Sequence, residues 1–210
     1  MKRRLFITGT DTNVGKTVLS ALLTAALDGV YWKPVQSGAC EGTDRQAVMR
    51  WSEIPESRTL PECYCFDPPV SPHLAARQAG VEINLNEIQI PAAREDTPLV
   101  VEGAGGVLTP LNEKETIADL IRSLGLPVVV ASRTSLGTIN HTLLTLAALR
   151  QAGAEVRGVV MLGPENNENR RAIERHGDAP VIGHVPWLAA INRTALLEVF
   201  ETKFDRGGFK

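Results

Sequence analysis

The chain has 210 residues, enough for one domain with a full hydrophobic core, so we expect residues 1–210 to form a single domain. Its 22 basic and 24 acidic side chains give a net charge of −2, which argues against a nucleic-acid partner because general nucleic-acid binders carry a basic excess. The absence of a long apolar run argues against a membrane span or signal peptide, so we expect no membrane partner. The three cysteines have no metal-type spacing and are expected to be reduced thiols, so we expect a cytoplasmic protein.

Short β-branched runs alternate along the chain with longer segments of helical periodicity. Such runs, apolar almost throughout and each followed by a helix, indicate a parallel sheet that is covered on both faces. The predicted fold is therefore a three-layer, doubly wound α/β fold with a mainly parallel sheet and helices on both faces. The expected strands are 4–8, 30–35, 98–103, 127–132, 156–162 and 180–185, and the main expected helices are 16–27, 116–124 and 137–153.

Two segments depart from this alternation. The proline-rich segment 53–80 is predicted to be a long active-site or dimer-contact loop with a short helix. The last six residues, DRGGFK (205–210), are predicted to be a frayed tail.

The first expected strand leads into TGTDTNVGKT, residues 8–17. The glycines of this segment lie one residue farther apart than in the usual phosphate loop G-x-x-x-x-G-K-[ST], with Thr10 at the first position. A phosphate loop needs inward-facing N–H groups, a helix N-terminus and a lysine, and NVGKT supplies all three. We therefore predict a nucleotide site as in P-loop NTPases, with Thr17 offering its hydroxyl to Mg²⁺. The alternative is a glycine turn that begins a helix and leaves Lys16 exposed.

Polar residues also follow other expected strands, at the edge of the sheet where ligands bind in such folds. Glu102 ends an otherwise apolar strand, where an unpaired carboxylate would be costly, so it is a candidate Mg²⁺ ligand. Asp44 is a second candidate, although Thr-Asp before a helix is more often an N-cap. Lys33 could stabilise a transferring phosphoryl group, or it could be an edge-strand lysine in solvent. Ser37 could bind a substrate or make a turn.

A further polar segment, SLGTINH, leads from a loop into the helix that begins near Thr138. The free N–H groups of this helix start, together with Asn140, could hold an anionic group such as a carboxylate.

Taken together, GTDTNVGKT, KPVQSG, VEGAGG, SLGTINH and GHVPWL resemble the dethiobiotin synthetase family over residues 6 to about 190. PPVSPHLAA is also similar to a loop of that family. The resemblance implies an ATP- and Mg²⁺-dependent cyclo-ligase that carboxylates 7,8-diaminopelargonate with CO₂ and closes the ring to dethiobiotin. It also implies a carbamate, then a carbamic-phosphoric anhydride, and a homodimer with substrate at the subunit interface.

The resemblance implies the following roles. The catalytic residues would be Lys16 and Lys33, and the metal ligands Thr17, Asp44 and Glu102. Substrate would contact Thr12, Lys33 and Ser37, and the partner's substrate would contact Gly137, Thr138 and Asn140. Besides the metal ligands, the nucleotide-binding residues would be Asn13, Val14, Gly15, Lys16, Val18, Gly103, Ala104, Gly105, Pro186, Trp187 and Leu188.

One departure from the family concerns the base. The family often places Asn-Asp after GVV to read adenine, whereas this chain has Leu162 and Gly163 there. Unless Asn166 or Asn167 reaches back, or backbone groups near Pro186 read the base, we expect relaxed base selectivity.

Two other assignments remain open from the sequence. Another ATP-dependent amidoligase of this fold, such as a cobyrinate amidase-type synthetase, would usually carry a glutamine-hydrolysing domain, for which this chain is too short. A partitioning-type ATPase switch would carry a further lysine early in the phosphate loop, where this chain reads TDTNV.

Overall fold

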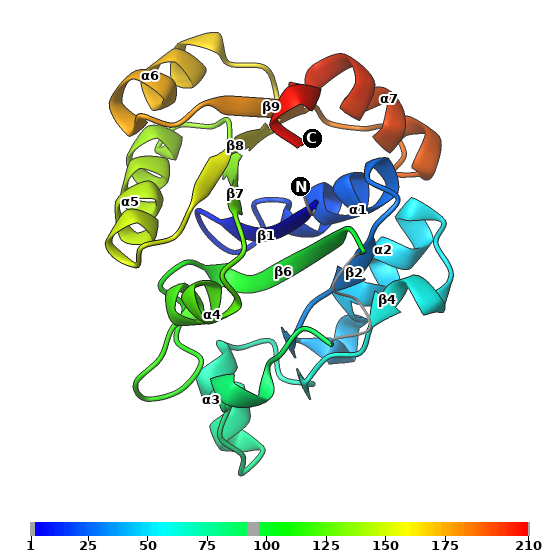
Figure 1. Ribbon diagram of the computed structural model, residues 1–210, viewed down its shortest axis with the longest axis vertical. Helices are drawn as coiled ribbons and strands as arrows, with labels where there is room; N and C mark the ends of the chain where they lie inside the picture. The colour runs from blue at the N-terminus through cyan, green and yellow to red at the C-terminus, as the bar shows by residue number, and fades with distance from the viewer. Residues whose placement is uncertain (1–2, 92–96, 210) are drawn as a thin grey trace.

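A seven-stranded, fully parallel sheet runs through the protein (Figure 1). The computed structural model describes residues 3–91 and 97–209. The strands lie in the order β4 (Thr59–Leu60), β2 (Val30–Trp32), β6 (Leu99–Gly106), β1 (Arg4–Gly9), β7 (Val128–Arg133), β8 (Val156–Leu162) and β9 (Val181–Val185).

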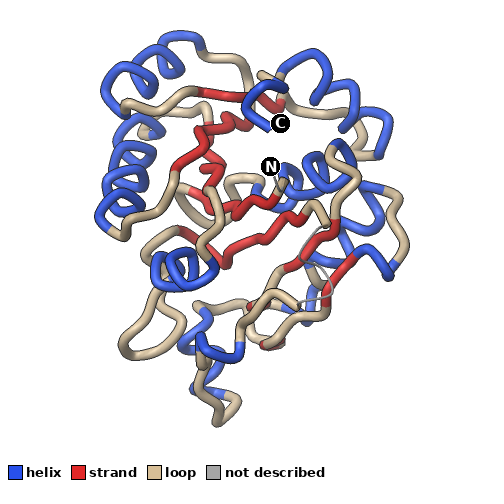
Figure 2. The backbone as a smooth tube through the Cα atoms, in the orientation of Figure 1, coloured by secondary structure: helices blue, strands red, loops and turns tan. Residues whose placement is uncertain are grey.

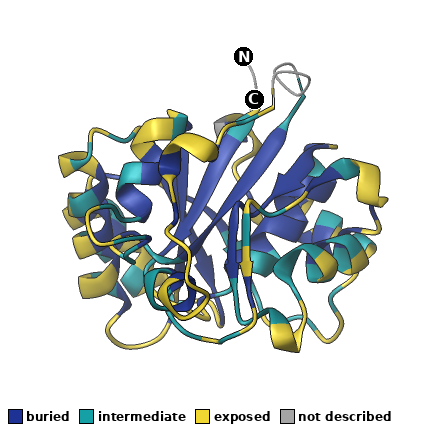
Figure 3. Ribbon diagram, turned by 90° about the horizontal axis from the view of Figure 1, so that it is seen from below, coloured by how far each residue is buried: buried dark blue, intermediate teal, exposed yellow. Residues whose placement is uncertain are grey.

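Helices cover both faces of this sheet, as the tube and burial views show (Figures 2 and 3). Alternate β1 residues face opposite layers: Phe6 packs in one core cluster, Leu5 and Ile7 in the other. The second cluster contains α1 (Lys16–Ala26), α2 (Asp44–Ser52) and α7 (Arg193–Lys203); the first contains α3 (Pro72–Gln78), α4 (Ile117–Leu124), α5 (Thr138–Gln151) and α6 (Asn167–Gly177). The predicted three-layer fold is confirmed.

The strand order reverses around β1, because β6 lies on one side of it and β7 on the other. Residue pairing places Glu102 of β6 beside Ile7, and Gly106 beside Gly9, at the carboxyl end of β1. The chain segments that follow β1 and β6 therefore emerge next to each other, which is where ligands bind in doubly wound sheets.

The predicted strand 30–35 is wrong in its second half. β2 ends at Trp32, and the chain leaves the sheet at Lys33 and Pro34. Proline has no N–H to continue a ladder. Its carbonyl instead accepts hydrogen bonds from the N–H groups of Cys63 and Tyr64. A separate two-stranded parallel sheet then forms between β3 (Val35–Ser37) and β5 (Tyr64–Phe66).

Segment 53–80 contains the predicted short helix, α3, but it is not a plain loop. It also supplies the edge strand β4, of two residues, and β5, of three residues. Both are too short to leave a periodic signal in the sequence. Single 3₁₀ turns occupy Ala39–Glu41, Glu56–Arg58, Leu85–Glu87 and Arg206–Phe209.

The predicted frayed tail is wrong for residues 205–209, and Lys210 lies outside the described residues. Phe209 is buried, with its ring 5.7 Å from that of Phe200 and 5.9 Å from that of Phe204. The Asp205 N–H donates to the carbonyl of Ile182 in β9, which ties the segment to the sheet edge. In the described part of the chain, no helix is both long and apolar enough to cross a bilayer.

We predict that Phe209→Ala lowers the free energy of unfolding by about 3 kcal/mol, because it removes an aromatic side chain from a packed cluster. Urea denaturation would measure this, with Glu201→Ala on the exposed side of α7 as a control that changes stability by less than about 0.5 kcal/mol. Equal stability of the two variants would contradict the packed arrangement.

Candidate nucleotide and phosphoryl-transfer site

The loop between β1 and α1 has the backbone form of a phosphate-binding loop despite its longer glycine spacing. Asn13 and Gly15 adopt positive φ angles of 57° and 99°. A Cβ on Gly15 would lie 2.6 Å from the Leu162 side chain, and one on Gly9 would lie 2.7 Å from Val14. Gly9 is therefore required by packing even though it stands one residue before the usual position.

The loop delivers the chain into the N-terminus of α1. Gly15 is the N-cap and brings no capping side chain, and the first turn of α1 contains no acidic residue. The N–H groups of this turn thus keep their capacity to bind an anion, and the helix dipole favours negative charge there.

Lys16 is not exposed, contrary to the alternative of a simple glycine turn. Its side chain is 6% exposed, and Nζ donates to the carbonyl oxygen of Asp11 at 2.9 Å. Burial, opposed by the negative charge of Glu102 and aided by the positive charge of Lys33, lowers the pKa of Lys16 to about 8. Below that pH, Lys16 is a desolvated cation at the end of the phosphate loop, where α1 begins.

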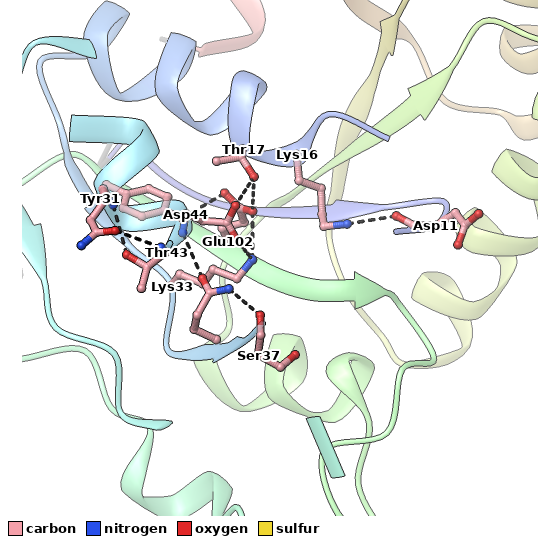
Figure 4. A network of polar contacts seen from close by, with 11 residues as sticks. Asp11, Lys16, Thr17, Tyr31, Lys33, Ser37, Thr43, Asp44 and Glu102 are labelled. Carbon is pink, nitrogen blue, oxygen red and sulfur yellow. Dashed lines mark hydrogen bonds and ion pairs between the residues drawn. The ribbon is translucent and has the colours of Figure 1, made fainter. Parts of the chain in front are cut away.

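Four side chains converge beside Lys16, from α1, α2, β6 and the segment that follows β2 (Figure 4). The Lys33 ammonium lies 2.5 Å from Asp44 Oδ2 and 3.2 Å from Glu102 Oε1. The Thr17 hydroxyl lies 2.7 Å from Asp44 Oδ1 and 3.1 Å from Glu102 Oε1. The sequence alternatives of an edge-strand lysine in solvent and of Asp44 as a mere N-cap are thus excluded: Thr43 is the N-cap of α2.

Electrostatics fix the charge state of the ion pair. Burial alone would lower the pKa of Lys33, but the charges of Glu102 and Asp44 outweigh it and raise the pKa above its ordinary value. Burial would likewise raise the pKa of Asp44, but Lys33 outweighs this effect and lowers it. Lys33 therefore stays protonated and Asp44 ionised at neutral pH.

Local structure explains why these groups meet. Because β2 and β6 are paired, with Trp32 beside Val101, Lys33 emerges next to Glu102. Asp44 is the first residue of α2, where its backbone N–H donates to the Gln36 side chain at 3.1 Å. Thr43 and Gln46 form a capping box that fixes this helix start.

Tyr31 is a site residue that the sequence analysis missed. It is fully buried, and its hydroxyl donates to Glu102 Oε2 at 3.0 Å, the carboxylate oxygen that neither Thr17 nor Lys33 contacts. The sequence did contain a signal. Tyr31 lies two residues before Lys33, so in the expected strand 30–35 the two side chains would share one face, and Tyr31 carries the hydroxyl of an otherwise apolar run.

Most of the predicted nucleotide residues of the loop, but not Lys16 and Thr17, come together with those of the segment after β9. They line one pocket of about 250 Å³ that is mostly apolar. Trp187 stands at this pocket with 78% of its side chain exposed. The lining residues are Asn13, Val14, Gly15, Val18, Arg133, Thr134, Ser135, Leu162, Pro164, Val185, Pro186, Trp187, Leu188 and Ile191.

Asn166 and Asn167, which could have replaced the family's adenine-reading Asn-Asp pair, do not line this pocket. The Asn166 side chain instead accepts the N–H of Asn169 and caps α6. Backbone groups of Gly163 are also engaged: its N–H donates to the Val185 carbonyl, and its carbonyl lies 2.7 Å from His184 Nε2.

The remaining predicted residues fall in two regions. Gly103, Ala104 and Gly105 lie within β6 and do not line the nucleotide pocket, so their nucleotide contacts stay a prediction. Thr12 lines a second pocket with Leu108, His141 and Leu144, next to α5. The other predicted substrate residues lie at the end of β3 (Ser37) and at the start of α5 (Gly137, Thr138 and Asn140).

The arrangement fits a hard divalent cation. Thr17 Oγ1 is within hydrogen-bond distance of both Asp44 and Glu102, so three oxygen-bearing groups already point to one place. Among the described residues, no group of three His, Cys, Asp or Glu side chains could hold a metal by itself. Such an ion would thus share these few protein ligands with substrate phosphates, as Mg²⁺ commonly does.

This fold and loop define a P-loop nucleotide-binding protein. An AAA domain family model matches residues 3–195. A ParA family ATPase from Chlorobium tepidum TLS has a similar structure, with a TM-score of 0.53 and 10% identity over 96% of this chain and 93% of that one.

Sequence similarity is more specific. The ATP-dependent dethiobiotin synthetase BioD of Rhodopseudomonas palustris (strain BisA53) is 47% identical over 100% of this chain and 97% of the relative. The corresponding protein of Agrobacterium fabrum is 46% identical over 100% and 98%. The chain belongs to the ATP-dependent dethiobiotin synthetase family.

We predict that Tyr31→Phe lowers the free energy of unfolding by about 1–3 kcal/mol, because it leaves a buried Glu102 oxygen without its donor. The matched control is Tyr64→Phe, whose hydroxyl donates to Glu87 and accepts the Asn84 N–H, both at the surface; its loss should cost less than about 0.5 kcal/mol. Urea denaturation of both variants would decide. A Tyr31→Phe protein as stable as the control would show that Glu102 does not depend on the hydroxyl.

Proposed function

We propose that this protein forms dethiobiotin from 7,8-diaminopelargonate, CO₂ and ATP. The observation that carries the proposal is the cluster of buried Lys33 and Glu102 with partly buried Asp44 and Thr17 beside a phosphate loop, in a chain of the dethiobiotin synthetase family. The proposed place of action is the cytoplasm.

The proposed reaction has three steps. One amine of the diamine attacks CO₂ and loses a proton to give a carbamate. A carbamate oxygen attacks the γ-phosphorus of ATP, which gives a carbamic-phosphoric anhydride and ADP. The second amine then attacks the carbamate carbon, the C–O bond to phosphate breaks, and the ring closes with release of phosphate and a proton.

Lys33 and Lys16 are the proposed catalytic residues. Lys33 would stabilise the carbamate and the charge on the transferring phosphoryl group, because its ammonium is buried and held charged by two carboxylates. Lys16 would exchange the neutral carbonyl of Asp11 for phosphate oxygens, which are stronger acceptors for a cation. A buried site also shields the labile carbamate from water.

Thr17, Asp44 and Glu102 would hold Mg²⁺. When bound, Mg²⁺ would neutralise charge on the phosphates of ATP and orient them for transfer.

A homodimer is part of the proposal. Two leucines that line the Thr12 pocket are exposed, Leu108 by 65% and Leu144 by 61%. Leu136, next to the start of α5, is fully exposed as well. Exposed leucines clustered around a pocket favour burial by a partner surface. A second copy would bring Gly137, Thr138 and Asn140 to the substrate carboxylate, and apolar surface to its alkyl chain.

To test the proposal, phosphate release is measured with ATP, Mg²⁺ and bicarbonate, with and without 7,8-diaminopelargonate. We expect release to require the diamine and dethiobiotin to form in equal amount. Lys33→Ala should lower kcat by about 100-fold or more, because it removes a preorganised cation from the reacting groups.

The control is Lys203→Ala, which removes an exposed lysine at the end of α7 and should leave kcat unchanged. Retained ATP binding by Lys33→Ala would show that the variant is folded. Release of phosphate that ignores the diamine would contradict the ligase and favour a nucleotide-driven switch.

We also predict relaxed base selectivity, with kcat/KM for CTP and GTP within about tenfold of that for ATP, because the pocket presents Leu162 and other apolar side chains to the base. Leu162→Asn should raise the preference for ATP by supplying a polar reader. A preference for ATP above about a hundredfold in the unaltered protein would overturn this prediction.

A further inference from the structure

Arg133 is a cation of the nucleotide pocket to which the proposed reaction gives no role. It is the last residue of β7, and it lines the pocket together with Asn13, Gly15 and Trp187. Its Nη2 donates to the carbonyl oxygen of Thr12 at 2.9 Å and lies 3.6 Å from Asp11 Oδ2. Arg133 thus reaches from the opposite side of β1 to the first turn of the phosphate loop.

Two adjacent carbonyls of the loop accept hydrogen bonds from cations. Asp11 O accepts from Lys16 Nζ, and Thr12 O accepts from Arg133 Nη2. A neutral carbonyl is a weaker partner for a cation than a phosphate oxygen. The Arg133 contact therefore resembles that of Lys16, which is the expected phosphate-binding lysine of the loop.

The backbone of Arg133 is fixed by buried hydroxyls. Its carbonyl accepts from Thr138 Oγ1 at 2.5 Å and from Ser132 Oγ at 3.0 Å, and the Thr142 hydroxyl donates to Ser132 Oγ at 3.2 Å. The side chain itself lines the pocket and is 44% exposed, so it can reorient while its anchor stays in place.

Charge balance also favours a further cation. Lys33 is more than neutralised by Asp44 and Glu102, so Lys16 and the α1 N-terminus are the main positive groups that the site offers to a polyphosphate. The guanidinium has five donors, and the hydrogen bond and ion pair that it makes in the described part of the chain both involve Nη2. Its remaining donors are available to a ligand in the pocket.

We propose that Arg133 is a nucleotide-binding residue whose guanidinium binds the phosphate chain of ATP and ADP. The proposal rests on the nucleotide site and not on the identity of the second substrate. Arg133 exchanges the Thr12 carbonyl for phosphate oxygens when nucleotide enters, and bidentate contact suits its planar fork.

The test is the dissociation constant of ATP and ADP by titration calorimetry, and of adenosine by competition, for the unaltered protein and for Arg133→Ala. We expect Arg133→Ala to weaken ATP and ADP by about 10- to 100-fold and adenosine by less than about threefold. Arg133→Lys should recover part of the loss, because it restores the positive charge but not the planar guanidinium that makes bidentate contacts. Arg122→Ala, at an exposed i,i+3 pair with Asp119 in α4, is the matched control and should change none of the constants.

Two results would overturn the proposal. Equal weakening of adenosine and ATP would mean that Arg133 only braces the pocket. A similar loss of ATP affinity in Asp11→Asn would mean that it acts through its ion pair with Asp11; the proposal expects Asp11→Asn to bind ATP as well as the unaltered protein, or better. Neither result depends on the diamine, so this test is separate from that of the ligase reaction.

Discussion

The site depends on the two ion pairs of one buried ammonium, that of Lys33, with the carboxylates of Asp44 and Glu102. Buried charges are tolerated only when they are paired and hydrogen-bonded. Here each carboxylate also has a neutral partner: Thr17 for both carboxylates and Tyr31 for Glu102. Lys33 joins the end of β2 to α2 and β6, so the same contacts that satisfy the charges also fix the relative positions of three elements. The cation is thereby held in place before any substrate arrives, which is what electrostatic preorganisation requires.

The sheet could be predicted from the sequence because its strands are nearly continuous apolar runs. All six expected strands lead to a strand of the structure, and Glu102 and Lys33 were recognisable as charges at strand ends. The phosphate loop was recognisable because NVGKT follows a strand and opens a helix. Chemistry at strand ends is easy to detect in a parallel fold, since all carboxyl ends meet at one edge.

Other features could not be predicted because they depend on contacts between distant segments. The two-residue strand β4 is too short to have a period, and β3 exists only because it pairs with β5. Phe209 follows two glycines, a context typical of a loose end, yet it meets Phe200 and Phe204 only in the folded chain. Tyr31 and Arg133 appear in the sequence as ordinary strand residues. Their roles depend on hydrogen bonds to Glu102 and Thr12, which are far away in the chain.

The central claim is that this site transfers the γ-phosphoryl group to a carbamate oxygen. If it does, ring closure leaves that oxygen on the released phosphate. The most direct test is a short reaction with ¹⁸O-labelled CO₂ in unlabelled water, followed by mass analysis of the phosphate. The account predicts one labelled oxygen in each phosphate released together with dethiobiotin. Phosphate without the label would contradict it, because the accepting oxygen would then have come from water.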